Sequence, residues 1–233
     1  MSSTLFGRAL AIGIVTLAAS SVQASDAGFR AQGNEPFWSL RMTDESITFQ
    51  PMDGDAVTIA PVPTATQDGD EEIFAAAVGG RNFRLAVTGQ LCVDTMSGMS
   101  FPSAVTVKLG DETYAGCGGE PAALLSGEWR VTAIDGADLV ADTEPSLSFD
   151  AEGRAVSGNA SCNRFFGGFS LTGEGLSFGE LGSSMMMCED AVMAQERALL
   201  DILEGTIGFT IADDGSLTLT TGDDRTLSAD RGS

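Results

Sequence analysis

The chain has 233 residues, of which 12 are Lys or Arg and 33 are Asp or Glu, and its formal net charge at pH 7 is −21. This charge repels phosphate backbones and anionic lipid surfaces, which argues against nucleic-acid binding. The sequence has no histidine, so Ser–His and Cys–His nucleophile pairs, His-ligated zinc and imidazole proton shuttles are excluded. Apolar residues make up 43% of the chain, enough to build the core of one or two domains.

The first 24 residues have the pattern of a secretory signal peptide. Arg8 precedes an apolar stretch over residues 9–19, and Val22 and Ala24 occupy positions −3 and −1 of a signal-peptidase site. A membrane anchor would need about 20 apolar residues, which is more than this stretch supplies. The pattern therefore predicts export to the periplasm, or secretion, with cleavage after Ala24. No later stretch is apolar enough to span a bilayer, so we expect no transmembrane segment in the mature chain.

Short β-branched or aromatic runs separated by turns fill residues 25–123, and none of them shows helical periodicity. The expected strands are Trp38–Met42, Ser46–Gln50, Ala56–Ala60, Ile73–Val78, Asn82–Thr88 and Ala104–Leu109. A Gly-Gly-Glu-Pro turn at residues 118–121 ends this pattern. We therefore expect an N-terminal β domain over residues 25–123 and a second domain over residues 124–233.

Residues 124–233 repeat the β pattern with one exception. The expected strands are Glu128–Ile134, Ser146–Phe149, Ala155–Gly158, Gly168–Leu171, Leu176–Phe178, Gly208–Ala212, Leu217–Thr221 and Thr226–Ala229. The exception is Asp190–Glu204, an amphipathic helix with Gly205 in the capping position. The predicted fold class is mainly β, with two small antiparallel sheet or barrel-like domains and one helix packed on the second sheet.

Glu196 lies within the apolar stripe of this helix, three or four residues from Val192, Leu199 and Leu200. A carboxylate in that position needs a partner, because burying an unpaired charge is costly. We expect a buried ion pair with an arginine such as Arg164, or hydrogen bonds from loop amides. A tuned catalytic acid is the functional alternative.

The four cysteines, Cys92, Cys117, Cys162 and Cys188, form an even set in a chain expected to be exported, which favours disulfides. Three connectivities are possible. The local pairing, Cys92 with Cys117 and Cys162 with Cys188, fits a chain that divides between the two pairs. A four-thiolate metal site is the rival, but it would need reducing conditions and the sequence has no C-x-x-C spacing.

Several motifs of the second half occur together in a characteristic order. They are Glu128-Trp129, the segment Ser157–Phe165 with Asn163 and Arg164, the segment Ser184–Cys188, and the helix Met193–Leu203 with Glu196. In order and spacing they resemble the META domain, the family of the bacterial heat-shock protein HslJ. Ser161 replaces the usual glycine and Ser184 the usual threonine. The resemblance implies a small β-barrel-like fold, an envelope location and association with stress responses, and it implies no reaction.

The first half has its own motifs. They are the run Gly33-Asn34-Glu35-Pro36-Phe37-Trp38, the segment Cys92–Gly98 with Asp94 at its centre, Phe101-Pro102, and Gly116–Gly119. Together they resemble an exported domain of unknown role that accompanies META modules. Phe37 and Trp38 either plug one end of the β domain or, beside the rigid proline, form a recognition surface.

Methionines gather beside the cysteines, with Met96 and Met99 near Cys92 and Met185–Met187 before Cys188. Thioethers bind Cu(I) in oxidising compartments, so weak copper binding is one interpretation. Core filling next to the disulfides is the other. Acidic turns such as Asp53–Asp55 do not match a calcium loop, and we interpret them as solvated turns.

No combination of nucleophile, base and oxyanion donor is evident in the sequence. We therefore expect a non-enzymatic periplasmic protein without a cofactor or bound metal, acting in envelope stress or as an interaction module. Its partner would be a protein or a small hydrophobic ligand of the cell envelope. The alternative is an inhibitor of a cationic hydrolase such as lysozyme, which the acidic surface would attract.

Overall fold

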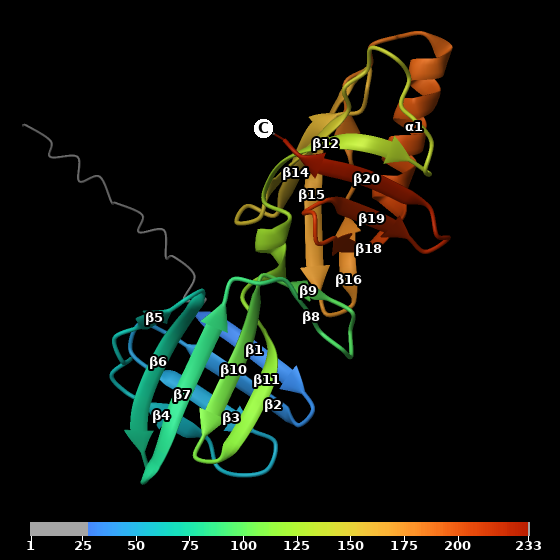
Figure 1. The fold of residues 1–233 in the computed structure, drawn as a ribbon. Coiled ribbons are helices and arrows are strands. Elements are labelled where there is room, and N and C mark those ends of the chain that lie inside the picture. The colour runs from blue at the N-terminus through green and yellow to red at the C-terminus, as the bar shows by residue number, and fades with distance from the viewer. Residues whose placement is uncertain (1–27, 233) are drawn as a thin grey trace, which may run out of the picture.

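The computed structural model describes residues 28–232, and the expected signal peptide lies outside this range. The chain forms two antiparallel sheets, one curled into a half-barrel and the other into a near-barrel (Figure 1). This arrangement confirms the mainly β prediction. Between residues 28 and 232, no helix combines the length and the hydrophobicity needed to cross a bilayer.

The first sheet has nine strands in the order β4-β3-β2-β1-β11-β10-β7-β6-β5. They are β1 (Phe29–Asn34), β2 (Phe37–Met42), β3 (Ile47–Pro51), β4 (Val57–Ile59), β5 (Thr66–Asp68), β6 (Glu71–Val78), β7 (Arg81–Thr88), β10 (Ser103–Leu109) and β11 (Glu112–Gly118). A separate two-stranded ribbon joins β8 (Cys92–Val93) to β9 (Ser100–Phe101). All six expected strands are present, whereas β1, β5, β8, β9 and β11 were not predicted.

The missed strand β1 reads Phe-Arg-Ala-Gln-Gly-Asn and lacks an apolar alternation long enough to indicate a strand. It becomes a strand because β2 pairs along its whole length, from Phe29 opposite Met42 to Asn34 opposite Phe37. On its other side β11 pairs with it at Ala31 and Gln32. The strand is therefore defined by its neighbours and not by its own residues.

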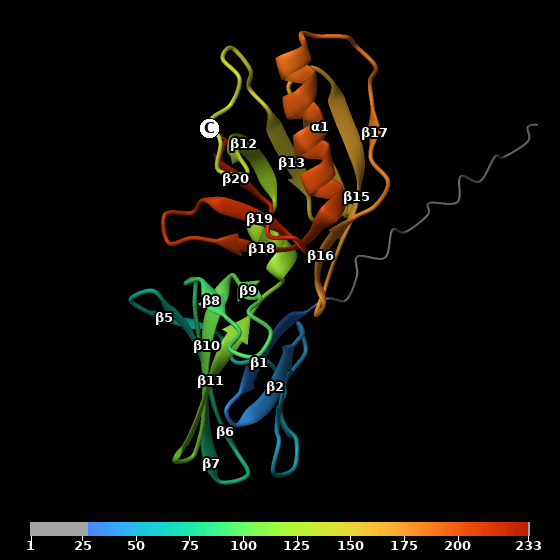
Figure 2. The same ribbon diagram turned by 90° about the vertical axis from the view of Figure 1, so that its right-hand side faces the viewer.

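The second sheet follows the order β16-β15-β14-β13-β12-β20-β19-β18, with β17 paired to β15. Its strands are β12 (Gly127–Ile134), β13 (Ser146–Asp150), β14 (Ala155–Asn159), β15 (Arg164–Thr172), β16 (Gly175–Phe178), β17 (Gly182–Ser183), β18 (Thr206–Ile211), β19 (Leu217–Thr221) and β20 (Thr226–Arg231). All eight expected strands are found here. The short 3₁₀ helix η1 (Pro121–Leu124) connects the two sheets (Figures 1 and 2).

The helix α1 (Asp190–Gly205) packs against β12, β16, β19 and β20 (Figure 2). Its buried residues are Glu196, Leu199, Ile202 and Leu203. Gly205 is the last helical residue and not the cap beyond it, because Thr206 already belongs to β18. The hydroxyl of Thr206 donates to the carbonyl of Ile202 at 2.7 Å and so satisfies one of the last carbonyls of the helix.

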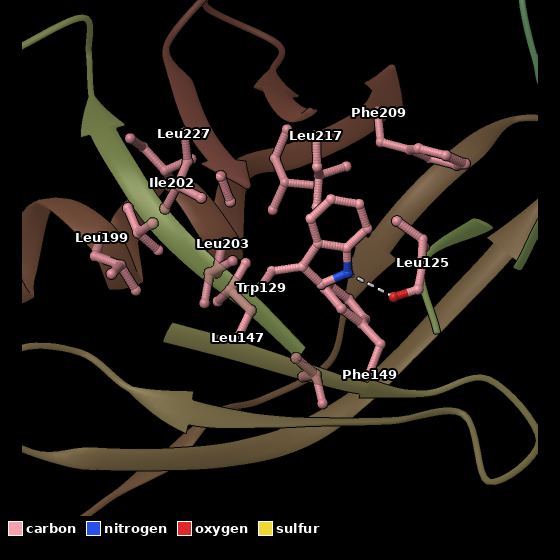
Figure 3. Packing of buried hydrophobic residues seen from close by; sticks show 14 of the residues in the cluster. Leu125, Trp129, Leu147, Phe149, Leu199, Ile202, Leu203, Phe209, Leu217 and Leu227 are labelled. Atoms are coloured by element: carbon pink, nitrogen blue, oxygen red, sulfur yellow. Dashed lines mark hydrogen bonds between the residues drawn. The ribbon is translucent and has the colours of Figure 1, made fainter. Parts of the chain in front are cut away.

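Trp129 lies at the centre of the second core, among leucines from α1 and four strands (Figure 3). Its indole N–H donates to the carbonyl of Leu125 at 2.7 Å. The Arg231 guanidinium lies 4.2 Å from the centroid of the Trp129 ring and donates to the carbonyls of Leu124 and Ser126. These contacts fasten the connecting segment to the first and last strands of the second sheet.

Candidate functional site

A cavity of about 410 Å³ lies against the first sheet, and the motifs of the N-terminal half converge on it. Residues 32–34 of β1, 104–106 of β10 and 115–117 of β11 form its floor. Residues 92–95, which we call the roof, line it on the side away from these strands. Its volume falls within the range of small-molecule sites in proteins.

The alternation of β10 divides the residues of that strand between the core and the cavity. Val105 and Val107 are buried in the half-barrel, whereas Ala104 and Thr106 point the other way and are half-buried. The Cys92–Cys117 disulfide, with the two Cα atoms 5.5 Å apart, ties the start of the roof to β11. The local cysteine pairing is thereby confirmed for this half.

Asp94 holds the roof in shape through both of its carboxylate oxygens. Oδ1 accepts the backbone N–H of Met96 at 3.1 Å and both the backbone N–H and the hydroxyl of Ser97 at 2.8 Å. Oδ2 accepts the side-chain amide of Asn34 at 2.9 Å. This last bond joins two motifs that lie 60 residues apart in the sequence.

The ionisation of Asp94 reflects this environment. Burial alone would raise its pKa, but the hydrogen bonds from Ser97, Asn34 and Met96 outweigh that effect and lower the pKa below the ordinary value. The carboxylate is therefore an ionised acceptor whose oxygens are already engaged. This arrangement suits a structural group and not a proton donor or acceptor for a substrate.

The aromatic pair of the first motif divides between two roles. Trp38 is buried, and its indole N–H donates to the carbonyl of Ala115 at 3.1 Å. Gly33 permits this contact, since a Cβ there would collide with the Trp38 indole and the Ala115 carbonyl. Phe37 is 44% exposed beyond the cis Glu35–Pro36 bond. Trp38 is thus buried as the plug interpretation requires, whereas Phe37 is exposed as a recognition surface would require.

Glu196 is buried, and the partners of its carboxylate come from a loop. Oε2 accepts the backbone N–H of Asn163 at 2.6 Å, and Oε1 accepts the side-chain amide of Asn163 at 2.9 Å. The expectation of loop amides is confirmed. The expected ion pair with Arg164 is wrong, because Arg164 is exposed, and its backbone N–H donates to the hydroxyl oxygen of Ser184 at 3.2 Å.

Asn163 extends this network to residues 184–188, which we call the strap. Its Oδ1 accepts the Ser184 hydroxyl and the Met186 backbone N–H, both at 2.7 Å, and its side-chain amide donates to the Met186 carbonyl at 3.1 Å. The disulfide between Cys162 and Cys188, with Cα atoms 6.0 Å apart, closes the same segment. The local pairing is confirmed here too.

The methionines near the disulfides do not fill the core as one interpretation expected. Met185 is 98% exposed and Met187 89% exposed, and Met186 and Met96 are exposed as well. Met99 alone among the five singled out by the sequence is partly buried, and it packs against the core of the second sheet. Copper binding by these thioethers stays a prediction.

Two contributors to these networks were missed in the sequence. Ser97 completes the hydrogen bonds of Asp94, and an Asp three residues before a Ser is a signal of such a turn. Gln195 donates to the hydroxyls of Thr143 and Ser161 and accepts the Val140 N–H at 2.6 Å. Within residues 28–232, no group of three or more Cys, Asp or Glu side chains is arranged to hold a metal ion.

The network around Glu196 predicts a sharp effect of a small substitution. In Glu196→Gln an amide group must face one of the two N–H donors of Asn163. We expect a loss of about 2 to 4 kcal/mol in the free energy of unfolding, measured by urea denaturation. Glu204→Gln is the control, because Glu204 is an exposed residue of the same helix. Equal effects of the two changes would contradict the structural role of Glu196.

The Asn34–Asp94 bond predicts a reciprocal rescue. Asp94→Asn sets one amide against another and should cost about 1 to 3 kcal/mol, whereas adding Asn34→Asp restores a donor and an acceptor and recovers most of the loss. Because the pKa of Asp94 is lowered, its stabilisation is present above about pH 4 and is lost as the pH falls through the folded-state pKa. Thermal melting between pH 2 and pH 7 should show a weaker acid dependence in Asp94→Asn. An unchanged pH profile would count against this role.

Comparisons with known proteins bear on the second half. The META domain model matches residues 122–232. An NMR structure of a protein from Burkholderia xenovorans is 26% identical over 48% of this chain and 86% of that chain, with a TM-score of 0.42. A second NMR structure is 24% identical over 47% and 93%, with a TM-score of 0.39. No curated protein matches the chain. Residues 122–232 thus form a META domain.

Proposed function

We propose that this chain is an exported, non-enzymatic binding protein whose N-terminal half takes a small, largely apolar ligand beneath the roof. The observation that carries this proposal is the cavity of about 410 Å³ on which Asn34, Glu35, Asp94 and the Cys92–Cys117 disulfide converge. A rigid floor of three strands and a roof held by a disulfide and an Asp-centred turn form a largely preorganised site.

The lining indicates the chemistry of the ligand. Val93, Ala104 and Ala115 supply apolar surface, and the Asn34 amide and the Thr95 hydroxyl provide polar contacts. The charged lining residues are both carboxylates, and no Lys or Arg lines the cavity. An anionic ligand would therefore meet repulsion, whereas an uncharged or cationic ligand would not.

The same lining supports binding without turnover. Among its residues, Asp94 has both oxygens engaged in hydrogen bonds, and the threonine hydroxyls have no histidine or lysine beside them. A hydroxyl nucleophile needs such a base to be activated at neutral pH. Glu35 apart, the lining thus offers recognition groups and no side chain placed to transfer a proton to or from a substrate.

The two disulfides fit an oxidising compartment, which supports export to the periplasm with the signal peptide removed after Ala24. Resemblance of the second half to heat-shock protein HslJ supports a role in envelope stress. In this proposal the first half recognises the ligand, and the META domain provides the second, disulfide-stapled unit of the same protein.

A matched pair of substitutions on β10 tests the cavity. Thr106→Trp places an indole in the cavity, whereas Lys108→Trp places it two residues further along the same strand, outside the lining. The uncharged fluorescent probe N-phenyl-1-naphthylamine should bind the native chain. We expect Thr106→Trp to weaken that binding at least about tenfold and Lys108→Trp to leave it within about twofold.

Equal binding of the probe by both variants would place it elsewhere on the surface and contradict the cavity proposal. No binding by the native chain would contradict an apolar ligand. Far-ultraviolet circular dichroism of each variant checks that the half-barrel is intact, so that a loss of binding is not a loss of fold.

Inhibition of a cationic hydrolase is the second candidate. An open, acidic hollow of about 620 Å³ lined by Asp142, Glu144, Thr143, Asn159 and Ser161 favours it, because a basic loop could enter this hollow. If the chain acts in this way, micromolar protein should inhibit lysozyme, and Asp142→Asn with Glu144→Gln should weaken inhibition at least about fivefold. Full lysozyme activity at that concentration would remove this candidate.

A further inference from the structure

Methionine exposure in this protein is the reverse of the usual pattern. Of the eight methionines among residues 28–232, five are exposed: Met52, Met96, Met185, Met186 and Met187. Methionine normally lies in cores, where its flexible side chain fills gaps. Three of the exposed residues are consecutive in the strap, so their display is a local feature of this segment.

The strap is held firmly although its side chains face solvent. Both the N–H and the carbonyl of Met186 bond to the side chain of Asn163, and the Ser184 hydroxyl bonds to the same amide oxygen. The buried carboxylate of Glu196 fixes Asn163 in turn. The Cys162–Cys188 disulfide closes the end of the segment. Backbone and covalent contacts therefore hold the strap, and its thioethers are left exposed.

The thioethers are also the reactive sulfur of this protein. All four cysteines of the chain are in disulfides, so no thiol competes for an oxidant. A two-electron oxidant converts methionine to its sulfoxide, which a methionine sulfoxide reductase returns to the thioether. In a core this change disrupts packing because the side chain becomes polar. At 98% and 89% exposure, Met185 and Met187 have no packing to lose.

We infer that the strap is a reversible oxidation site, which removes oxidants such as hypochlorous acid while the protein stays folded. Hypochlorous acid gives its oxygen atom to the sulfur, which is oxidised to the sulfoxide, and leaves as chloride with release of a proton. In the repair step two thiols of the reductase system give two electrons and two protons. The sulfoxide oxygen leaves as water, and the thiols become a disulfide. This inference is independent of the cavity in the first half.

The experiment uses the full mature chain, treated with increasing amounts of hypochlorous acid. Peptide mass mapping locates each added oxygen, and a thermal melt follows the fold. We expect Met185, Met186 and Met187 to be oxidised before the partly buried Met42, Met99 and Met193. The melting temperature should stay within about 2 °C while the strap is oxidised. Reductases of both sulfoxide stereospecificities should then return the strap to its starting mass.

The variant Met185→Leu, Met186→Leu, Met187→Leu should take up about three fewer oxygen atoms under the same treatment, whereas Met193→Leu should match the native chain over the first additions. Three outcomes would overturn the inference. One is oxidation of Met42, Met99 or Met193 before the strap. Another is a fall in melting temperature of about 5 °C or more while the strap alone is oxidised. The third is failure of the reductases to act on the folded chain.

Discussion

The structure depends on satisfying buried carboxylates in a chain that has few cations to pair with them. The sequence has 33 acidic residues and 12 basic ones, and both carboxylates that lie deepest, Asp94 and Glu196, accept hydrogen bonds from an asparagine. An amide satisfies a carboxylate without a second charge that would also need to be desolvated. Neutral donors therefore take the place that arginine or lysine fills in many other proteins.

An asparagine–carboxylate hydrogen bond of this kind occurs in each half and holds a neighbouring segment in place. Asn34 and Asp94 lie beside the Cys92–Cys117 disulfide and shape the roof, while Asn163 and Glu196 lie beside the Cys162–Cys188 disulfide and hold the strap. In both cases a segment outside the large sheets, the roof or the strap, has a disulfide and a set of side-chain hydrogen bonds to hold it. Each half of the protein thus presents one ordered segment. The roof of the first half lines a cavity, and the strap of the second half carries exposed thioethers.

Strands with a clear apolar alternation could be predicted from the sequence, and those defined by their neighbours could not. β10 and β19 alternate cleanly and were expected, whereas β11 reads Glu-Thr-Tyr-Ala-Gly-Cys-Gly and has glycines where apolar residues would mark a strand. Gly116 lies there because a Cβ would collide with the carbonyl of Gln32 on β1. Such close approach between strands depends on tertiary structure, so no local pattern reports it.

The candidate sites were predictable in their components and not in their assembly. The spacing of Glu196 indicated burial and a need for partners, but a choice between Arg164 and loop amides required the path of the loop. The position of the methionines beside the cysteines suggested core filling. Proximity in sequence to a disulfide does not tell whether a side chain points into the core or into solvent, so this interpretation could not be tested from the sequence. Ser161, which stands where the META family usually has glycine, adopts a φ of 101°, a region that favours glycine. The glycine of the family pattern thus corresponds to a backbone position with positive φ. In this chain a serine occupies that position, and its hydroxyl accepts a hydrogen bond from Gln195.

Met99 lies just beyond the roof, five residues after Asp94, and packs against the core of the META domain. The roof, which lines the cavity, is therefore continuous along the chain with a contact between the two halves. Thermodynamic reciprocity follows from this continuity. If a ligand under the roof favours one arrangement of the halves over another, that arrangement increases the affinity for the ligand by the same factor. Under that condition, binding of a ligand to the first half changes the orientation of the two halves relative to each other.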